Sequence, residues 1–314
     1  MRVDILKVVL VIASVAILIG IGIVIGINIK DNKDNPVLVM HDGGEWVLEP
    51  GMEAEMIYNN FWAFARASYI LVGEIPDCQF YKIVSEVPRN DYDKENFYID
   101  DSGSYMYYHD DLGASVTTVA IDVSAFQQYV DWEMVKASGV DVAIIRVGYR
   151  GYGSGEIVLD DMFESHIQEA YDAGLRVGVY FYSQALNYDE GVEEARFVLD
   201  NIADYDISCP VVIDTEMVYD DEARTNDLDI ASRTDGVVGF CETVKSAGYT
   251  PMIYSNRNWF AQSLDMSRLG DYKLWLAHYS NQPDFPYVYS GWQYTDQGQI
   301  YGIDGSVDLN VWFE

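Results

Sequence analysis

The pattern of apolar and polar residues divides the chain into three parts. Residues 8–27 read VVLVIASVAILIGIGIVIGI, an uncharged run long enough to cross the hydrocarbon core of a bilayer as a helix. Residues 31–117 show short apolar patches without a long repeat. From Val119 onward, strand-like apolar runs alternate with helical segments. We therefore expect an N-terminal anchor (1–30), a spacer (31–117) and a folded domain (118–314).

The first segment has the features of an uncleaved membrane anchor. A buried helix of a soluble protein would carry polar residues on one face, and this run carries none. A signal peptide would have a shorter apolar region followed by a small-residue cleavage site, whereas NIKDNKDN follows here. We expect residues 8–27 to hold the chain in a lipid bilayer as a single pass. The Lys and Arg residues near its two ends are balanced, so charge leaves the orientation open.

Within the spacer, the stretch ENFYIDDSGSYMYYHDDLG alternates aromatic and polar residues around Asp-Ser-Gly. This pattern predicts a β-hairpin that turns at Gly103. We identify no residues in the spacer that indicate chemistry.

The C-terminal region predicts a barrel. Its β-runs are continuously apolar, as is typical of strands buried on both faces, and the first five are each followed by a helical segment. Three further runs, KLWLAHYS, GWQYTD and VDLNVW, follow without long helices between them. We expect an α/β fold, a closed TIM-like barrel whose last part lacks helices. The alternative is a doubly wound open sheet, which would usually carry a glycine-rich loop after its first strand, where DVSAFQ stands.

Charge and cysteine content argue against two classes of function, nucleic-acid binding and metal binding. The formal charge of −32 would repel a phosphate backbone, so we expect no nucleic-acid partner. Cys78, Cys209 and Cys241 lack metal-ligand spacing, and no acidic loop of calcium-binding spacing is present. We expect neither a metal site nor a cofactor.

In a β/α barrel the active site lies at the carboxyl ends of the strands. Acidic residues, aromatic residues and one arginine stand at these positions in the predicted strands: Asp122, Arg146, Tyr180, Tyr182, Asp214, Glu216, Tyr254, Trp275, Tyr279, Trp292 and Asp308. Aromatic rings offer flat apolar faces on which sugar rings can stack.

Asp214 and Glu216 in PVVIDTE indicate acid chemistry. Residues i and i+2 of a strand point the same way, so both carboxyls should face the barrel axis. Two close carboxyls cannot both ionise cheaply, and one therefore keeps its proton to higher pH. A protonated acid beside an ionised one is what cleavage of a glycosidic bond needs. The triplet alone is a weak signal, because a polar strand end facing solvent has the same pattern.

Several motifs in order resemble glycoside hydrolase family 25, the muramidase-type lysozymes. They are AIDVSAFQQYVDWEMVKASGVDVAIIRVGYRG, VGVYFYSQA, PVVIDTE, YSN, LWLAHY, GWQYTDQG and VDLNVW, and together they cover roughly residues 118–314. The resemblance implies an irregular (β/α)5β3 barrel. It also implies cleavage of the β-1,4 bond between N-acetylmuramic acid and N-acetylglucosamine in peptidoglycan.

The resemblance assigns roles to individual residues. Glu216 matches the family's general acid and Asp214 the carboxylate beside it, while Asp122 and Asp308 match two further acids of the site. The positions that match residues lining the groove are Tyr182, Tyr180, Arg146, Tyr279 and Trp292. Strand-end position alone adds Tyr254 and Trp275 as substrate-binding residues.

Three mechanisms are compatible with paired carboxyls: a protein nucleophile, inversion, and attack by the substrate's own acetamido oxygen. The resemblance implies the third, with retention. Other functions also stay open, namely a non-catalytic module that binds cell-wall glycan, another acetamido-assisted glycosidase of the chitinase kind, and a metal-dependent hydrolase.

Because peptidoglycan lies outside the membrane, we expect the N-terminus inside and the catalytic domain outside the cell membrane. A reporter fused to the C-terminus should therefore be extracytoplasmic, and a cytoplasmic reporter would contradict this orientation. The sequence leaves open the biological role, the tolerance of modified glycans, the pH optimum, the oligomeric state and the role of residues 31–117.

Overall fold

The structure is a computed structural model that describes residues 36–40, 46–50, 62–63, 65–74, 78–101 and 103–313. It divides into two compact units, Met1–Ile83 and Val84–Glu314. In these described ranges no helix is long and apolar enough to cross a bilayer. The predicted anchor, residues 8–27, lies outside the described residues and stays a prediction.

The described part of the first unit contains two antiparallel hairpins. Strands β1 (Pro36–Met40) and β2 (Trp46–Pro50) form one, and β3 (Tyr69–Val72) and β4 (Gln79–Lys82) form the other. Trp62, Ala65 and Cys78 form a small buried cluster against which Leu71 and Phe80 pack.

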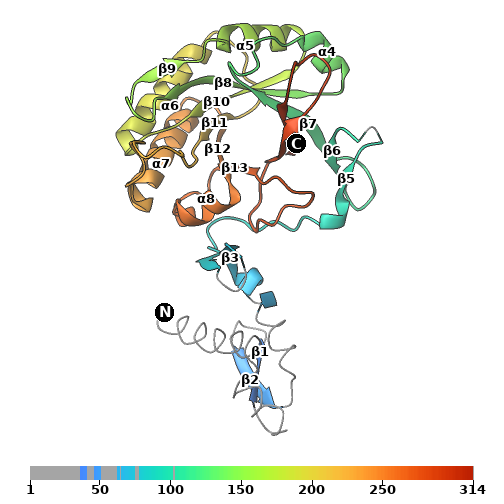
Figure 1. Cartoon of the computed structure of the whole chain (residues 1–314), viewed down its shortest axis with the longest axis vertical. Helices are drawn as coiled ribbons and strands as arrows, with labels where there is room; N and C mark the ends of the chain where they lie inside the picture. Colours follow the sequence, from blue (N-terminus) through green and yellow to red (C-terminus); the bar gives the residue numbers. More distant parts are fainter. Residues whose placement is uncertain are drawn as a thin grey trace. The chain divides into compact units, whose positions relative to one another are not determined.

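The second unit contains a closed eight-stranded barrel (Figure 1). Its strands follow the order β10-β11-β12-β13-β14-β15-β7-β8, and β8 pairs again with β10. The bounds of these strands are β7 (Thr117–Val123), β8 (Val142–Arg150), β10 (Arg176–Tyr182), β11 (Val211–Asp214), β12 (Pro251–Asn256), β13 (Lys273–Ala277), β14 (Gly291–Gly298) and β15 (Val307–Phe313). A short strand, β9 (Ile157–Leu159), extends the sheet from β8.

Five helices follow the first five barrel strands: α4 (Trp132–Ala137), α5 (Phe163–Asp172), α6 (Tyr188–Ile202), α7 (Ile230–Ser246) and α8 (Arg257–Gln262). The two longest of these helices begin at capping residues: the side chains of Asn187 and Asp229 accept hydrogen bonds from the backbone of the first turns of α6 and α7. The predicted (β/α)5β3 arrangement is therefore present, and the eight predicted strand segments all occur in the barrel.

Helices α6 and α7 pack very closely on the outside of the barrel. A Cβ atom on Gly191 would lie 1.9 Å from the carbonyl oxygen of Gly236, so these helix backbones can approach only because no side chain stands at this position.

The direction of β15 differs from that of the other barrel strands. It runs antiparallel to both β14 and β7, with Asp308 opposite Asp122 and Asn310 opposite Ala120. We read Asp308 as the end of a parallel strand, and this reading is wrong. Asp308 stands at the beginning of β15, and the reversed direction brings it to the carboxyl end of β7.

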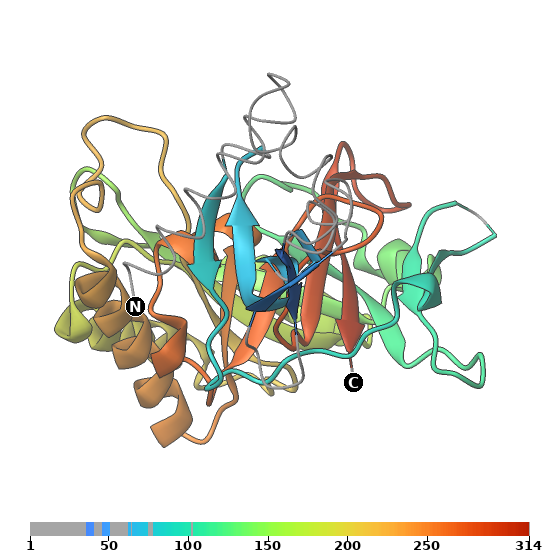
Figure 2. The same cartoon turned by 90° about the horizontal axis from the view of Figure 1, so that it is seen from below.

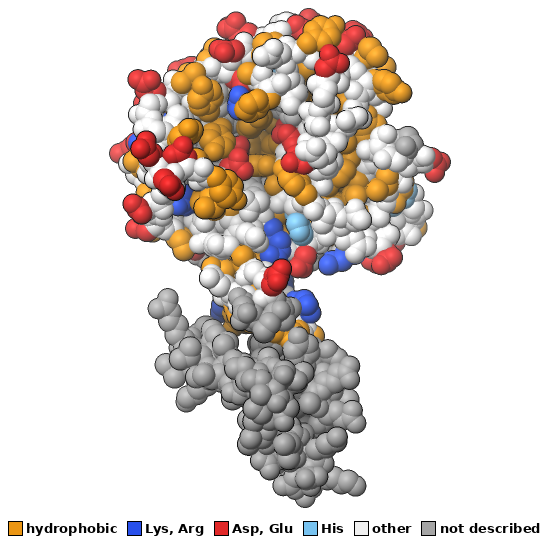
Figure 3. All heavy atoms as spheres, viewed as in Figure 1, with side chains coloured by type: hydrophobic (Ala, Val, Ile, Leu, Met, Phe, Trp, Pro, Cys, Tyr) orange, Lys and Arg blue, Asp and Glu red, His pale blue; other side chains and the backbone are white. Residues whose placement is uncertain are grey.

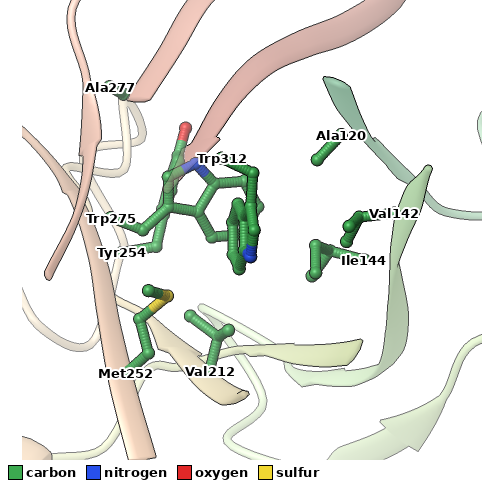
Figure 4. Packing of buried hydrophobic residues seen from close by; sticks show 9 residues of the cluster. All are labelled: Ala120, Val142, Ile144, Val212, Met252, Tyr254, Trp275, Ala277 and Trp312. Atoms are coloured by element: carbon green, nitrogen blue, oxygen red, sulfur yellow. The ribbon is translucent and has the colours of Figure 1, made fainter. Parts of the chain in front are cut away.

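The barrel interior is filled by side chains and is not a channel (Figure 4). Trp275 lies between Tyr254 and Trp312, with ring centroids at 4.6 Å and 5.7 Å. The remaining members of this buried cluster are Ala120, Val142, Ile144, Val212, Met252 and Ala277. This core forms the floor beneath the carboxyl ends of the strands.

Residues 84–116, which we call the strap, pack on the barrel near β14 and β15, where no long helix lies. The predicted hairpin is confirmed, since β5 (Phe97–Ile99) and β6 (Met106–Tyr108) pair antiparallel and Gly103 has a positive φ of 76°. The strap also contains the short helix η1 (Lys94–Asn96), and a second short helix, η2 (Met266–Arg268), precedes β13. Figure 2 shows the hairpin on the opposite side of the barrel from α6 and α7.

Aromatic contacts join the strap to the barrel. Tyr92 stacks on Phe313 with centroids at 4.7 Å, and Phe97 meets Trp292 edge-on at 5.0 Å. The Tyr92 hydroxyl donates to the carbonyl of Tyr289 at 2.8 Å. The compact unit begins at Val84, so it includes the strap. The predicted domain begins at residue 118 instead, and this start of the family domain stays a prediction.

Candidate active site

A cavity of about 970 Å³ opens at the carboxyl ends of the parallel barrel strands. Figure 3 shows a hollow in this unit that is bordered by acidic and hydrophobic side chains. Ten of the eleven predicted site residues line the cavity: Asp122, Arg146, Tyr180, Tyr182, Asp214, Glu216, Tyr254, Trp275, Tyr279 and Asp308.

Trp292 is the exception, and its prediction as a groove residue is wrong. Its ring is fully buried, its Nε1 donates to the carbonyl of His278 at 2.8 Å, and it packs on Phe97 of the strap. Successive strand residues face opposite sides of a sheet, so the inward residue of β14 is Gln293.

Two amide side chains to which we assigned no role from the sequence hold Asp122 in place. Gln293 Nε2 lies 3.2 Å and 3.0 Å from the two Asp122 oxygens, and Asn310 Nδ2 donates to Oδ2 at 2.8 Å. Each amide is oriented in turn, because Tyr254 donates to Gln293 Oε1 at 2.8 Å and Trp275 Nε1 donates to Asn310 Oδ1 at 2.7 Å. The inward alternation of β14 and β15 was the available signal for both amides.

These donors favour the ionised form of Asp122 over the ionised form of Asp308, which lies opposite it. Burial raises the pKa of Asp122 to about 6, and hydrogen bonds from Asn310, Gln293 and Asp308 oppose the rise. Burial and then the charge of Asp122 raise the pKa of Asp308 to about 8. Asp308 is therefore the carboxyl that keeps its proton, and its O–H donates a hydrogen bond to the Asp122 carboxylate.

The pair at the end of β11 has a different environment. Burial, then the nearby charges of Glu216 and Asp122, raise the pKa of Asp214 well above its ordinary value. Burial and then Asp122 raise the pKa of Glu216 to about 7. Among the described residues, Asp214 Oδ1 is buried without a hydrogen-bond partner. The pair therefore holds a proton near neutral pH and leaves acceptor capacity unused.

The positive charge of Arg146 lowers the pKa of Asp214 and so opposes the effect of burial. Arg146 Nε donates to Asp160 Oδ2 at 2.6 Å, and its guanidinium carbon lies 5.4 Å from the ring centroid of Phe126 and 5.5 Å from that of Tyr149. Asp160 also accepts from the backbone of Ala125, so the same carboxylate fixes Arg146 and the loop after β7.

Within the described ranges, no group of three or more His, Cys, Asp or Glu side chains is arranged to hold a metal ion. The expectation that neither a metal nor a cofactor takes part stays a prediction.

The raised carboxyl pKa values predict that the site costs stability at high pH. An unfolded chain releases the Asp308 proton near its ordinary pKa of 3.8, whereas the folded chain keeps it to about 8. The folded state thus binds more protons between these values, and stability falls as pH rises. Asp308→Asn should raise the free energy of unfolding at pH 8 by about 1–3 kcal/mol and change it little at pH 4.

Denaturant unfolding of both proteins at the two pH values measures this difference. Asp304→Asn is the matched control, because Asp304 is exposed in the loop before β15. A loss of stability at pH 8 in Asp308→Asn, or an equal gain in Asp304→Asn, would contradict the prediction.

Comparison with known proteins agrees with this geometry. The family model of glycosyl hydrolases family 25 matches residues 121–303. An autolytic lysozyme of Clostridium acetobutylicum is 29% identical over 195 residues, which are 62% of this chain and 55% of the relative. Lysozyme M1 of Streptomyces globisporus is 25% identical over 200 residues, which are 60% of this chain and 66% of the relative.

Solved structures of similar fold include members of the same family. The modular autolysin LytC of Streptococcus pneumoniae, solved with a synthetic peptidoglycan ligand, has a TM-score of 0.58 and 25% identity, covering 79% of this chain and 61% of LytC. A family 25 glycosyl hydrolase of Bacillus anthracis, with a TM-score of 0.54 and 20% identity over 66% of this chain and 93% of its own, shares the fold. The chain spans little more than half the length of the C. acetobutylicum relative.

Proposed function

Because this chain belongs to glycosyl hydrolases family 25, we propose that it is a peptidoglycan hydrolase, an N-acetylmuramidase. It would cleave the β-1,4 bond between N-acetylmuramic acid and N-acetylglucosamine in glycan strands. The relatives named as lysozymes and the peptidoglycan ligand of LytC support this substrate class.

The observation that carries the proposal is the placement of Asp214 and Glu216. Both line a cavity large enough for several sugar rings, and burial raises the pKa of Glu216 to about 7. A carboxyl with this pKa can give a proton to a leaving oxygen and later take one from water near neutral pH.

In the proposed reaction, the oxygen of the substrate's acetamido group attacks the anomeric carbon while the bond to the leaving oxygen breaks. Glu216 gives its proton to that leaving oxygen. Water then attacks the anomeric carbon of the cyclic intermediate, Glu216 takes the proton of this water, and the acetamido group is restored. Two displacements at one carbon retain its configuration.

Asp214 is proposed to orient the acetamido group. No hydrogen bond within the described residues occupies its side chain. The N–H of the acetamido group would donate to this carboxyl, favour its ionised form and stabilise the positive charge that develops on the group.

Asp122 and Asp308 are proposed to stabilise the positive charge of the transition state. Neither takes part in the proton transfer to the leaving oxygen. Asp122 is fixed by Gln293 and Asn310 and ionises before its neighbour Asp308. Its negative charge would stabilise the positive charge that develops in the oxocarbenium-like transition state.

The pKa values predict a narrow pH profile. Activity requires protonated Glu216 and ionised Asp122, with pKa values of about 7 and about 6 in the free protein. The carboxyls titrate as a coupled group, so the pKa values read from the pH profile belong to the group and not to single residues. Release of reducing ends from purified peptidoglycan should give kcat/KM values with a maximum between about pH 6 and pH 7. A plateau that continues to pH 9 would contradict the assignment of Glu216 as the acid.

A further inference from the structure

Two loops next to the carboxylates form one side of the cavity mouth. Residues 151–155 follow β8, and residues 215–229 connect β11 to α7. Tyr152, Met217 and Tyr219 from these loops all line the cavity. They are also exposed, Tyr219 to 92% and the other two to nearly half. Large apolar side chains that stay exposed and continue a cavity indicate a binding surface.

We propose that Tyr152, Met217 and Tyr219 form an outer sugar-binding site, held in shape by Arg224. This inference rests on the proposed function. The ligand is a sugar ring of the glycan strand, beyond the two rings that flank the cleaved bond. A flexible thioether and two flat rings suit the apolar face of a pyranose ring and the methyl of its acetamido group. The continuity of these side chains with the catalytic cavity identifies a neighbouring part of the same strand as the ligand.

Arg224 connects the two loops to each other and to α6. Its backbone N–H donates to the carbonyl of Tyr152 at 2.9 Å, so the second loop is tied directly to the first. Its guanidinium forms an ion pair with Glu190 of α6 at 2.8 Å and reaches the carbonyl of Gln184 at 3.3 Å. Gly155 makes this approach possible, because a Cβ atom there would lie 3.0 Å from the Arg224 guanidinium carbon.

A second arginine supports the loop after β8. Arg150 donates to the carbonyl of Gly155 at 2.9 Å and forms a buried ion pair with Glu194 of α6 at 2.8 Å. The Glu194 carboxylate is occupied further by the hydroxyl of Ser183 at 2.6 Å. Both loops are therefore fixed to the start of α6, which lowers the entropy lost when a sugar binds.

Arg224 does not line the cavity, so it is a positioning residue and not a catalytic one. Its loss should change how the outer site binds a sugar without changing the chemistry at Glu216. A contact made equally in the ground state and the transition state changes KM and leaves kcat alone. Strands too short to reach the outer site should be insensitive to it.

The experiment measures kcat and KM of the full chain on two soluble uncrosslinked peptidoglycan strands. One is the shortest strand that the wild type cleaves, and the other is several disaccharides longer. Tyr219→Ala tests the site directly, since this exposed side chain adds little to folding. Tyr171→Ala is the control, because Tyr171 is half-exposed near the C-terminal end of α5, at the opposite face of the barrel.

Tyr219→Ala should raise KM on the long strand about five- to tenfold, leave kcat unchanged, and alter the short-strand constants less than about twofold. Tyr171→Ala should match the wild type on both. An unchanged long-strand KM, or an equal rise on both strands, overturns the outer site. A wild type that cleaves neither strand shows instead that the proposed function has failed, and the outer site fails with it.

Arg224→Met should reproduce the selective rise in long-strand KM. Arg224→Lys should recover part of it, because an ammonium keeps the charge opposite Glu190 but loses the second contact to Gln184. An equal fall of kcat on both strand lengths in Arg224→Met, or no recovery in Arg224→Lys, overturns the positioning role.

Discussion

Glu216→Gln should lower kcat on peptidoglycan by about 10³-fold and leave the fold intact. Glutamine keeps the shape of the side chain and cannot supply the proton that the leaving oxygen needs. The same substitution removes a carboxyl whose pKa burial raises to about 7. The variant should therefore unfold at the same denaturant concentration as the wild type, or at a higher one, at pH 8. Loss of activity with undiminished stability separates a catalytic role from a structural role.

Glu222→Gln is the matched control for this prediction. Glu222 is exposed in the same β11–α7 segment, and its substitution should leave kcat within about twofold of the wild type. Activity of Glu216→Gln within about threefold of the wild type would remove Glu216 from the reaction and with it the proposed mechanism.

Removal of the strap should have the largest effect on stability. A chain of residues 118–314 contains every predicted catalytic residue and lacks the aromatic partners of β14 and β15. Trp292 and Tyr289, which are almost fully buried, would be exposed to water, and so would the ring face of Phe313 that Tyr92 covers. Burial of one large aromatic side chain contributes about 1.5–3 kcal/mol, so several together rival the whole stability of a domain.

We therefore expect a chain of residues 84–314 to unfold cooperatively in denaturant, and a chain of residues 118–314 to aggregate or to unfold without a sharp transition. Calorimetry and near-ultraviolet circular dichroism of the two chains measure this difference. Equal midpoints of unfolding for both chains would mean that the strap is dispensable and that the barrel is complete from residue 118.

The strands and the position of the site were predictable because burial leaves a direct pattern in the sequence. The continuous apolar run in PVVIDTE is typical of a strand covered on both faces, and the two carboxyls follow this run at the end of the strand. The hairpin around Gly103 was predictable for a similar local reason. Ten of the residues we chose line one cavity because strand ends meet at one rim of a barrel.

The errors have one physical origin, which is that local patterns carry no information on direction or partner. Nothing in VDLNVW distinguishes a parallel strand from an antiparallel one, so Asp308 was placed at the wrong end of β15. The aromatic side of GWQYTD was taken for the cavity side, but Trp292 packs on the strap and Gln293 faces inward. The role of Gln293 and Asn310 could not be predicted, because it depends on the position of Asp122 in the folded chain.

The most direct test of the central claim is mass spectrometry of the soluble products that the full chain releases from purified peptidoglycan, with Glu216→Gln in parallel. We predict fragments that end in a reducing N-acetylmuramic acid, absent from the Glu216→Gln digest. Fragments that end in a reducing N-acetylglucosamine, or no fragments from a wild-type protein that still binds the glycan, would contradict the assignment of this barrel as a muramidase.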